Sequence, residues 1–158
     1  MHKWLWLSVL VIVLDQLTKY WASQALQLHE PVAVLPFFNF TLMHNTGAAF
    51  SFLNQAGGWQ RWFFITIALI VSTVIVLWIR RLPATERWMA LALSLIAGGA
   101  LGNVWDRIQH GYVVDFIDLY YQNWHWPAFN VADSAITVGA VMLVLESFKG
   151  SKVFRKQD

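Results

Sequence analysis

Two aspartates in the C-terminal third of the chain have the setting that acid–base chemistry requires. Asp115 lies within an apolar run (VVDF), and Asp133 follows another such run (FNVAD). A carboxylate near apolar surroundings is costly unless it is paired, hydrogen-bonded or hydrated. Two carboxyl groups that share a proton titrate at different pH values, so one is an ionised base and the other a neutral acid near pH 7. Such a pair can activate water and polarise a peptide carbonyl.

A structural role explains the same two residues and stays open on sequence alone. Asp133 would cap a helix that begins near it, and Asp115 would pair with Arg107. Asp118 follows Asp115 by three residues, so on a strand it would face the opposite side and take no part in the chemistry.

Two further acidic residues have simpler structural interpretations. Asp15 and Lys19 are spaced i, i+4 and can pair on one helix face, which indicates a supporting role. Asp106 is adjacent to Arg107, where a local salt bridge or a helix cap would explain it.

Other chemistries find little support in the sequence. The five histidines show neither an HExxH motif nor an i, i+4 pair, which argues against a zinc protease. The chain contains no cysteine, hence no thiol nucleophile, disulfide or thiolate metal site. Ser51 and Ser134 lack the context of a serine nucleophile. The glycines at 98, 99 and 102 predict close helix packing rather than a phosphate loop. We expect neither a metal nor a cofactor.

The composition is that of a small membrane protein. Of its 158 residues, 58% are hydrophobic and 13% charged, about half the charged share of a soluble domain. The net charge of +2 is too small to suggest a nucleic-acid partner. A bilayer core about 30 Å thick is crossed by about 20 helical residues. The sequence predicts four such spans, at approximately residues 4–22, 62–79, 88–105 and 131–148.

The first span has an alternative interpretation as the apolar region of a cleaved signal peptide. Lys3 precedes the apolar run, and residues 23–25 form a tolerable cleavage pattern. However, Asp15, Lys19 and two bulky rings lie between the run and that site. A retained helix therefore fits better.

The distribution of basic residues predicts the orientation of the chain. All Lys and Arg except Lys19, Arg61 and Arg107 lie in the N-terminus, the loop between the second and third spans, or the C-terminal tail. Basic residues favour the cytoplasmic side, so both termini are expected there. Residues 23–59 and 106–130 would then face outward, which in a bacterial inner membrane is the periplasm.

The outward segments contain patterns typical of strands. Residues 38–45 alternate as a half-buried strand does, and residues 50–52 repeat the pattern after a turn at 45–47. Residues 112–118 form another extended run that could join them. The predicted fold is an all-α membrane protein, a four-helix bundle with a small periplasmic β-cradle, forming one domain over residues 1–158.

Five motifs in this order resemble those of the lipoprotein signal peptidase, or signal peptidase II, family. They span nearly the whole chain, and together they are specific although each alone is weak. The motifs are DQLTK at 15–19, NTGAAF at 45–50, GNVWDR at 102–107, VVDF at 113–116 and FNVADS at 129–134.

The resemblance implies an aspartic endopeptidase that removes signal peptides from diacylglyceryl-modified prolipoproteins, cutting just before the lipidated cysteine. By motif position, Asp115 and Asp133 would be catalytic. The family is also the target of the cyclic peptide globomycin. The resemblance further implies a monomer that contacts membrane lipid. The substrate-binding residues would be Asn45, Asn103, Arg107 and Asn130, supported by Asp15, Lys19 and Asp106.

Two other classes of function remain as alternatives. A proton- or ion-handling transport subunit predicts a carboxylate near the bilayer midplane, beside a broken helix. Here the acidic residues gather at the outer boundary, and the second and third spans are free of charge through their middles. A membrane scaffold without enzymatic activity predicts that Asp-to-Asn changes affect stability alone.

Overall fold

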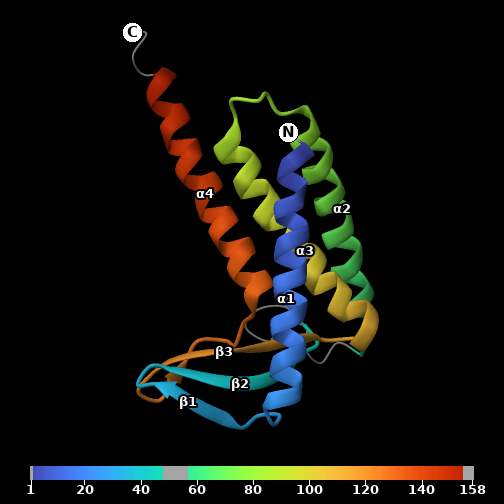
Figure 1. Ribbon diagram of the computed structural model, residues 1–158, viewed down its shortest axis with the longest axis vertical. Helices are drawn as coiled ribbons and strands as arrows, with labels where there is room; N and C mark the ends of the chain where they lie inside the picture. The colour runs from blue at the N-terminus through green and yellow to red at the C-terminus, as the bar shows by residue number, and fades with distance from the viewer. Residues whose placement is uncertain (1, 48–56, 155–158) are drawn as a thin grey trace.

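The computed structural model describes residues 2–47 and 57–154, with side chains through Phe148. These residues form four long helices and an antiparallel sheet at one end of the helix bundle (Figure 1). All four helices are long and apolar enough to cross a membrane. They are α1 (Leu5–Ala25), α2 (Trp59–Arg81), α3 (Arg87–His110) and α4 (Val131–Phe154). The predicted spans fall on these helices, except that Trp4 belongs to a short 3-10 turn at His2–Trp4.

Helix α3 is the centre of the bundle, and it packs against α1, α2 and α4. Its glycines make this possible, as the sequence predicted. A Cβ added to Gly98 would lie 2.8 Å from the Ser8 carbonyl oxygen on α1, and one added to Gly99 would clash with the Ala132 carbonyl oxygen on α4. These contacts bring the polar residues of three helices together at the end nearest the sheet.

The outer faces of the helices are apolar and exposed. On α2, for example, Ile70 and Val74 are more than half exposed, as expected of side chains that face lipid. The inner face of α2 packs Ile75 and Ile79 against Leu93 and Ala97 of α3. The bundle therefore presents its apolar surface to lipid.

The sheet has four strands in the order β1-β2-β3-β4. They are β1 (Pro31–Leu35), β2 (Phe38–Asn45), β3 (Val113–Tyr121) and β4 (Trp124–His125). The predicted strands at 38–45 and 112–118 are thus present and pair directly, with Met43 opposite Asp115. The expected strand at 50–52 lies outside the described residues. Strands β1 and β4 were not predicted, because β1 is apolar without alternation and β4 has only two residues.

A glycine determines where the chain leaves α3 for β3. Gly111 has a φ of 85°, and its N–H donates to the Arg107 carbonyl at 3.1 Å. Glycine adopts this left-handed conformation without a Cβ penalty, and it ends the helix. The turn directs β3 back across the end of the bundle, where Val114 and Phe116 pack on Ala22 of α1. The opposite face of β3 carries Asp115.

Candidate active site

Asp115 is held on β3 by two asparagine amides. Asn45 Nδ2 donates to its Oδ2 at 3.1 Å, and Asn130 Nδ2 donates to its Oδ1 at 2.7 Å. The carboxyl group is 2% exposed. Both donors are neutral, so they fix the carboxyl group in place without neutralising its charge.

Asp133 lies in the first turn of α4, where it takes part in a reciprocal cap. Its backbone N–H donates to Asn130 Oδ1 at 2.8 Å, and its Oδ2 accepts from the Asn130 backbone N–H at 3.3 Å. This is a capping box in which Asn130 is the cap. The structural interpretation of Asp133 as the cap is therefore wrong in detail. The other oxygen, Oδ1, accepts from Asn103 Nδ2 at 2.8 Å.

Asn130 connects the two carboxyl groups. It is fully buried, and its one amide contacts Asp115 through Nδ2 and the Asp133 backbone through Oδ1. Nδ2 also lies within hydrogen-bonding distance of the Val114 carbonyl and of Asn103 Oδ1. The Asn130 side chain thus links β3 directly to the start of α4.

The surroundings of Asp115 favour its protonated form more than water does. Burial, and next the charge of Asp133, raise the pKa of Asp115 from 3.8 to about 7. The hydrogen bonds from Asn45 and Asn130 oppose this rise, but they are the smaller influence. At neutral pH the group can therefore act as either a proton donor or a proton acceptor.

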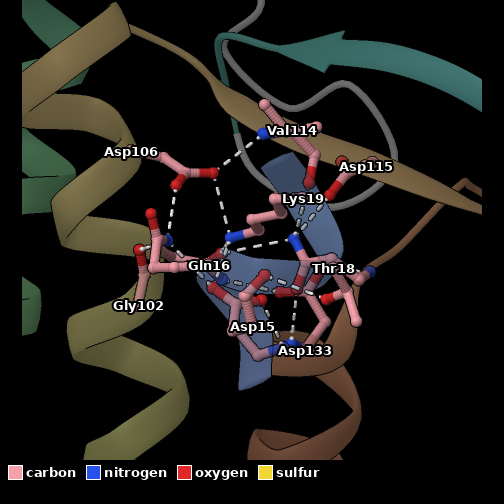
Figure 2. A network of polar contacts seen from close by, with 12 residues as sticks. Asp15, Gln16, Thr18, Lys19, Gly102, Asp106, Val114, Asp115 and Asp133 are labelled. Carbon is pink, nitrogen blue, oxygen red and sulfur yellow. Dashed lines mark hydrogen bonds and ion pairs between the residues drawn. The ribbon is translucent and has the colours of Figure 1, made fainter. Parts of the chain in front are cut away.

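A buried cation lies behind the two carboxyl groups. Lys19 Nζ is 2.8 Å from Asp15 Oδ2 and 2.9 Å from Asp106 Oδ2, and it donates to Asn103 Oδ1 at 3.0 Å. Figure 2 shows this amine among the side chains of Asp15, Gln16 and Asp106. The predicted i, i+4 pair is confirmed. Through Asn103, Lys19 also fixes the amide that donates to Asp133.

Asp15 and Asp106 bond to backbone as well as to Lys19. Asp15 Oδ1 accepts from the Ala132 N–H at 2.9 Å, and Asp106 Oδ2 accepts from the Val114 N–H at 3.0 Å. Each therefore anchors an element that carries one of the two site aspartates. Gln16 Nε2 joins them, because it lies 3.2 Å from Asp15 Oδ2 and 2.8 Å from Asp106 Oδ1. The sequence assigned Gln16 no role, although it stands within the first motif.

Arg107 does not make the ion pairs that the sequence suggested. In the described part of the chain, no direct ion pair joins it to Asp106, whose partner is Lys19, or to Asp115, which the asparagines hold. Its Nη2 donates to the Gly47 carbonyl at 2.8 Å, and its guanidinium lies 5.1 Å from the ring centre of Phe64. The predicted salt bridge between adjacent Asp106 and Arg107 is absent among the described contacts because consecutive helical residues point in different directions.

Asp115 and Asp133 line one cavity of about 740 Å³. Its polar end contains the two aspartates with Asn45, Asn103 and Arg107. Asn130 is not among the lining residues, and its amide holds the aspartates from behind. The rest of the cavity is largely apolar, with side chains from β3, α4 and the segment between them. These include Leu119, Trp126, Pro127, Ala128, Phe129, Ile136 and Val138.

Asp118 points away from this cavity, as its spacing predicted. Its carboxylate contacts Asn39, Thr41 and His125 on the other face of the sheet. The hydrogen bonds from these side chains outweigh the effect of burial and lower the pKa of Asp118. His44, by contrast, lines the cavity although the sequence gave it no role. Its position beside Asn45 on β2 was the available signal.

Comparison with known proteins agrees with this architecture. A family model described as signal peptidase (SPase) II matches residues 7–149. The lipoprotein signal peptidase of Acinetobacter baumannii is 59% identical over 145 residues, covering 92% of this chain and 82% of that protein. That of Pseudomonas putida is 58% identical over 151 residues, covering 94% and 88%.

A solved structure shows the same fold. It is described as a bacterial membrane enzyme solved by the in meso method at 2.3 Å resolution, and it superposes with a TM-score of 0.88 at 31% identity. The match covers all of this chain and 94% of the other. With the family match over most of its length, this chain belongs to the signal peptidase II family of proteases.

Proposed function

We propose that this protein is an aspartic endopeptidase with Asp115 and Asp133 as its catalytic pair. The observation that carries the proposal is that both carboxyl groups line one cavity while Asp115 has a pKa of about 7. One carboxyl group can then be protonated while the other is ionised. Residues 1–158 act as a single membrane-embedded peptidase domain.

The reaction needs only water and these two groups. The ionised aspartate accepts a proton from water as the water oxygen attacks the peptide carbonyl carbon, while the neutral aspartate donates its proton to the carbonyl oxygen. In the second step the carbon–nitrogen bond breaks, and the aspartate that took the water proton gives it to the leaving amine. The other aspartate, ionised after the first step, takes a proton from a hydroxyl group of the diol intermediate as the new carboxyl group forms, which restores the starting state of the pair. Because the pair titrates as a unit, either aspartate can begin as the acid.

The substrates are diacylglyceryl-modified prolipoproteins, cut just before the lipidated cysteine. The relatives are named lipoprotein signal peptidases, which supports this activity over an ion-handling transport subunit. Two acyl chains would hold the cysteine near the headgroups, at about 0.8 kcal/mol for each buried CH₂ group. The largely apolar cavity beside the aspartates suits such a substrate.

Arg107 and the asparagines of the polar end bind the unwound peptide. A scissile bond inside a helix must first lose its internal hydrogen bonds, and polar side chains can then satisfy the freed groups. Arg107 lines the cavity, and its guanidinium group carries N–H donors that suit a substrate carbonyl. Asn45 and Asn103 add amides at the same end. A globomycin-type cyclic peptide would compete for these groups.

The chain functions as a monomer in the bacterial inner membrane, with both termini cytoplasmic and the active site on the periplasmic side. The positions of the basic residues support this orientation. The start of α1, the α2–α3 connection and the C-terminal part of α4 share the end of the bundle opposite the sheet (Figure 1).

Cleavage of a lipidated prolipoprotein by the purified protein in detergent tests the proposal. Asp115→Asn and Asp133→Asn are expected to abolish cleavage, whereas Asp118→Asn keeps its turnover at saturating substrate. The unlipidated precursor should be cut far more slowly than the lipidated one. Cleavage by either dyad variant at the wild-type rate would refute the mechanism, and equal rates on both precursors would refute the role of the lipid.

A further inference from the structure

The face of the sheet opposite the cavity carries a polar cluster that the proposed reaction does not use. Asp118 Oδ1 lies 2.7 Å from His125 Nδ1 on β4. Its Oδ2 accepts from Thr41 Oγ1 at 2.9 Å and from Asn39 Nδ2 at 3.3 Å, both on β2. One carboxylate therefore ties together β2, β3 and β4. Its side chain is 8% exposed, whereas that of His125 is 51% exposed.

The chemistry of this contact fixes the orientation of the His125 ring. Asp118 is an acceptor, because its three partners favour the ionised form. Nδ1 of His125 must then carry the hydrogen, whether the ring is neutral or protonated. The ring of Tyr120 stacks on His125, with ring centres 5.3 Å apart and planes 19° from parallel. The ring is thus held by one edge and one face.

His125 directly precedes the residues that form one side of the cavity. We call Trp126, Pro127, Ala128 and Phe129 the cavity wall, since all four line the cavity. Phe129 exchanges backbone hydrogen bonds with Ile117, at 2.9 and 3.1 Å. At the other end, the Trp126 N–H donates to the Leu119 carbonyl at 2.8 Å.

The two ends of the cavity wall are held in different ways. Phe129 is followed at once by Asn130, which is fixed by the capping box and by Asp115. The Trp126 end follows a strand of only two residues, and Pro127 has no N–H to offer. At this end the contact between His125 and Asp118 adds a side-chain tie one residue before Trp126, whose own ring contacts Trp124.

We propose that the Asp118–His125 pair is a positioning element for substrate binding, which keeps the cavity wall in place from the opposite face of the sheet. The identity of the substrate rests on the proposed function, but the mechanical role does not. Asp115 and Asp133 receive their hydrogen bonds from Asn45, Asn103 and Asn130, none of which belongs to the wall. Release of the wall should therefore weaken substrate binding and leave the chemical step intact.

Steady-state cleavage of a lipidated prolipoprotein by the full-length protein measures this difference. His125→Ala should raise KM about three- to tenfold, the factor expected when one hydrogen bond is lost, with kcat changed by less than about twofold. His125→Asn should restore most of the wild-type KM, because its amide can place a donor near the position of Nδ1. His2→Ala, at an exposed position far from the sheet, is the matched control and should match wild type.

Amide hydrogen exchange gives a second measurement that needs no activity. In His125→Ala, the Trp126 N–H should exchange faster than in wild type, while the Asp133 N–H in the capping box should keep its protection. An unchanged KM together with unchanged exchange at Trp126 would overturn the proposal, and so would a loss confined to kcat. If wild type fails to cleave the lipidated substrate, the proposed function fails, and the exchange data alone still decide the role of the pair.

Discussion

Asp115 and Asp118 stand three residues apart on the same strand, yet they have opposite electrostatic character. Asp115 faces the cavity, where burial and the charge of Asp133 raise its pKa to about 7. Asp118 faces the other side, where hydrogen bonds from His125, Thr41 and Asn39 lower its pKa. Both residues are nearly buried, at 2% and 6% exposure. Low solvent exposure by itself therefore does not make an aspartate a proton donor at neutral pH.

The difference lies in how deeply each carboxyl group is buried, which is more for Asp115, and in what each one contacts. Asp118 contacts an imidazole that can carry positive charge, along with two short polar side chains from the next strand. Among the described residues, Asp115 accepts side-chain hydrogen bonds from the amides of Asn45 and Asn130, and the nearby charge of Asp133 is of the same sign. The buried cation on that side, Lys19, is engaged by Asp15 and Asp106. Burial and the like charge of Asp133 therefore raise the pKa of Asp115 to about 7, and the hydrogen bonds from the two neutral amides only partly oppose this rise.

The largest expected effect tests this comparison directly through activity. Asp115→Asn removes a group that transfers a proton, so kcat should fall by about 10²-fold to 10⁴-fold. Asp118→Asn keeps an acceptor oxygen for Thr41 and leaves the cavity face unchanged, so its kcat should stay near wild type. Both rates come from one cleavage assay at saturating substrate.

The opposite ranking would break the comparison. If Asp118→Asn lost kcat and Asp115→Asn kept it, the reacting face of β3 would be the one on which Asp118 contacts His125. As controls, circular dichroism should show that each variant is folded, and size-exclusion chromatography should show that it elutes at the same volume as wild type.

The sequence was sufficient to predict the helices, two strands and the opposed faces of β3. Charge-free runs of 18 residues have few alternatives to a membrane span, and period-two alternation assigned Asp115 and Asp118 to opposite faces. The glycines at 98 and 99 predicted the close packing of α3 correctly. These features depend on local composition or spacing, which a single sequence contains.

The partners of the buried charges could not be predicted in the same way. Asp106 pairs with Lys19, which is 87 residues away in the chain, rather than with adjacent Arg107. Asn130, for which the family resemblance implies substrate binding, caps α4 and holds Asp115, and neither contact was predicted. Such contacts depend on how α1, α3 and α4 cross, and helix crossing is not encoded in the spacing of one segment.

The second largest expected effect is on stability, and it comes from the buried cation Lys19. Lys19→Met leaves Asp15 and Asp106 buried without their partner, which should lower the free energy of unfolding by about 3–5 kcal/mol. It should also raise the pKa of Asp115 further, because Lys19 opposes that rise. Thermal unfolding in detergent measures the first effect. Lys3→Met, at an exposed position, is the control, and a similar loss in both variants would contradict a specific role for Lys19.

A third effect appears in the pH dependence of stability. Because the pKa of Asp115 is raised, the folded state binds its proton more tightly than the unfolded state does. Stability should therefore fall as pH rises from 3.8 to about 7, by up to about 4 kcal/mol at 1.36 kcal/mol per pH unit.

Asp115→Asn cannot ionise and should lack this decline. The stability of the variant relative to wild type should therefore increase from pH 4 to pH 8. This holds whether the variant is more or less stable than wild type at pH 4. Unfolding midpoints measured for both proteins across that range give the difference. A difference that stays constant with pH would show that Asp115 has an ordinary pKa.

The smallest effect has the opposite sign and comes from Asp118. A lowered pKa means that its ionised form stabilises the fold above pH 3.8, and this stabilisation is lost as pH falls through the lowered value. Asp118→Asn should therefore reduce stability at pH 7 by about 1.5–3 kcal/mol, the range for a hydrogen bond to a charged group, and by less at pH 3. The same unfolding series measures it. If Asp118→Asn and Asp115→Asn shifted stability in the same direction as pH rises, the two faces of β3 would not differ in the way their contacts require.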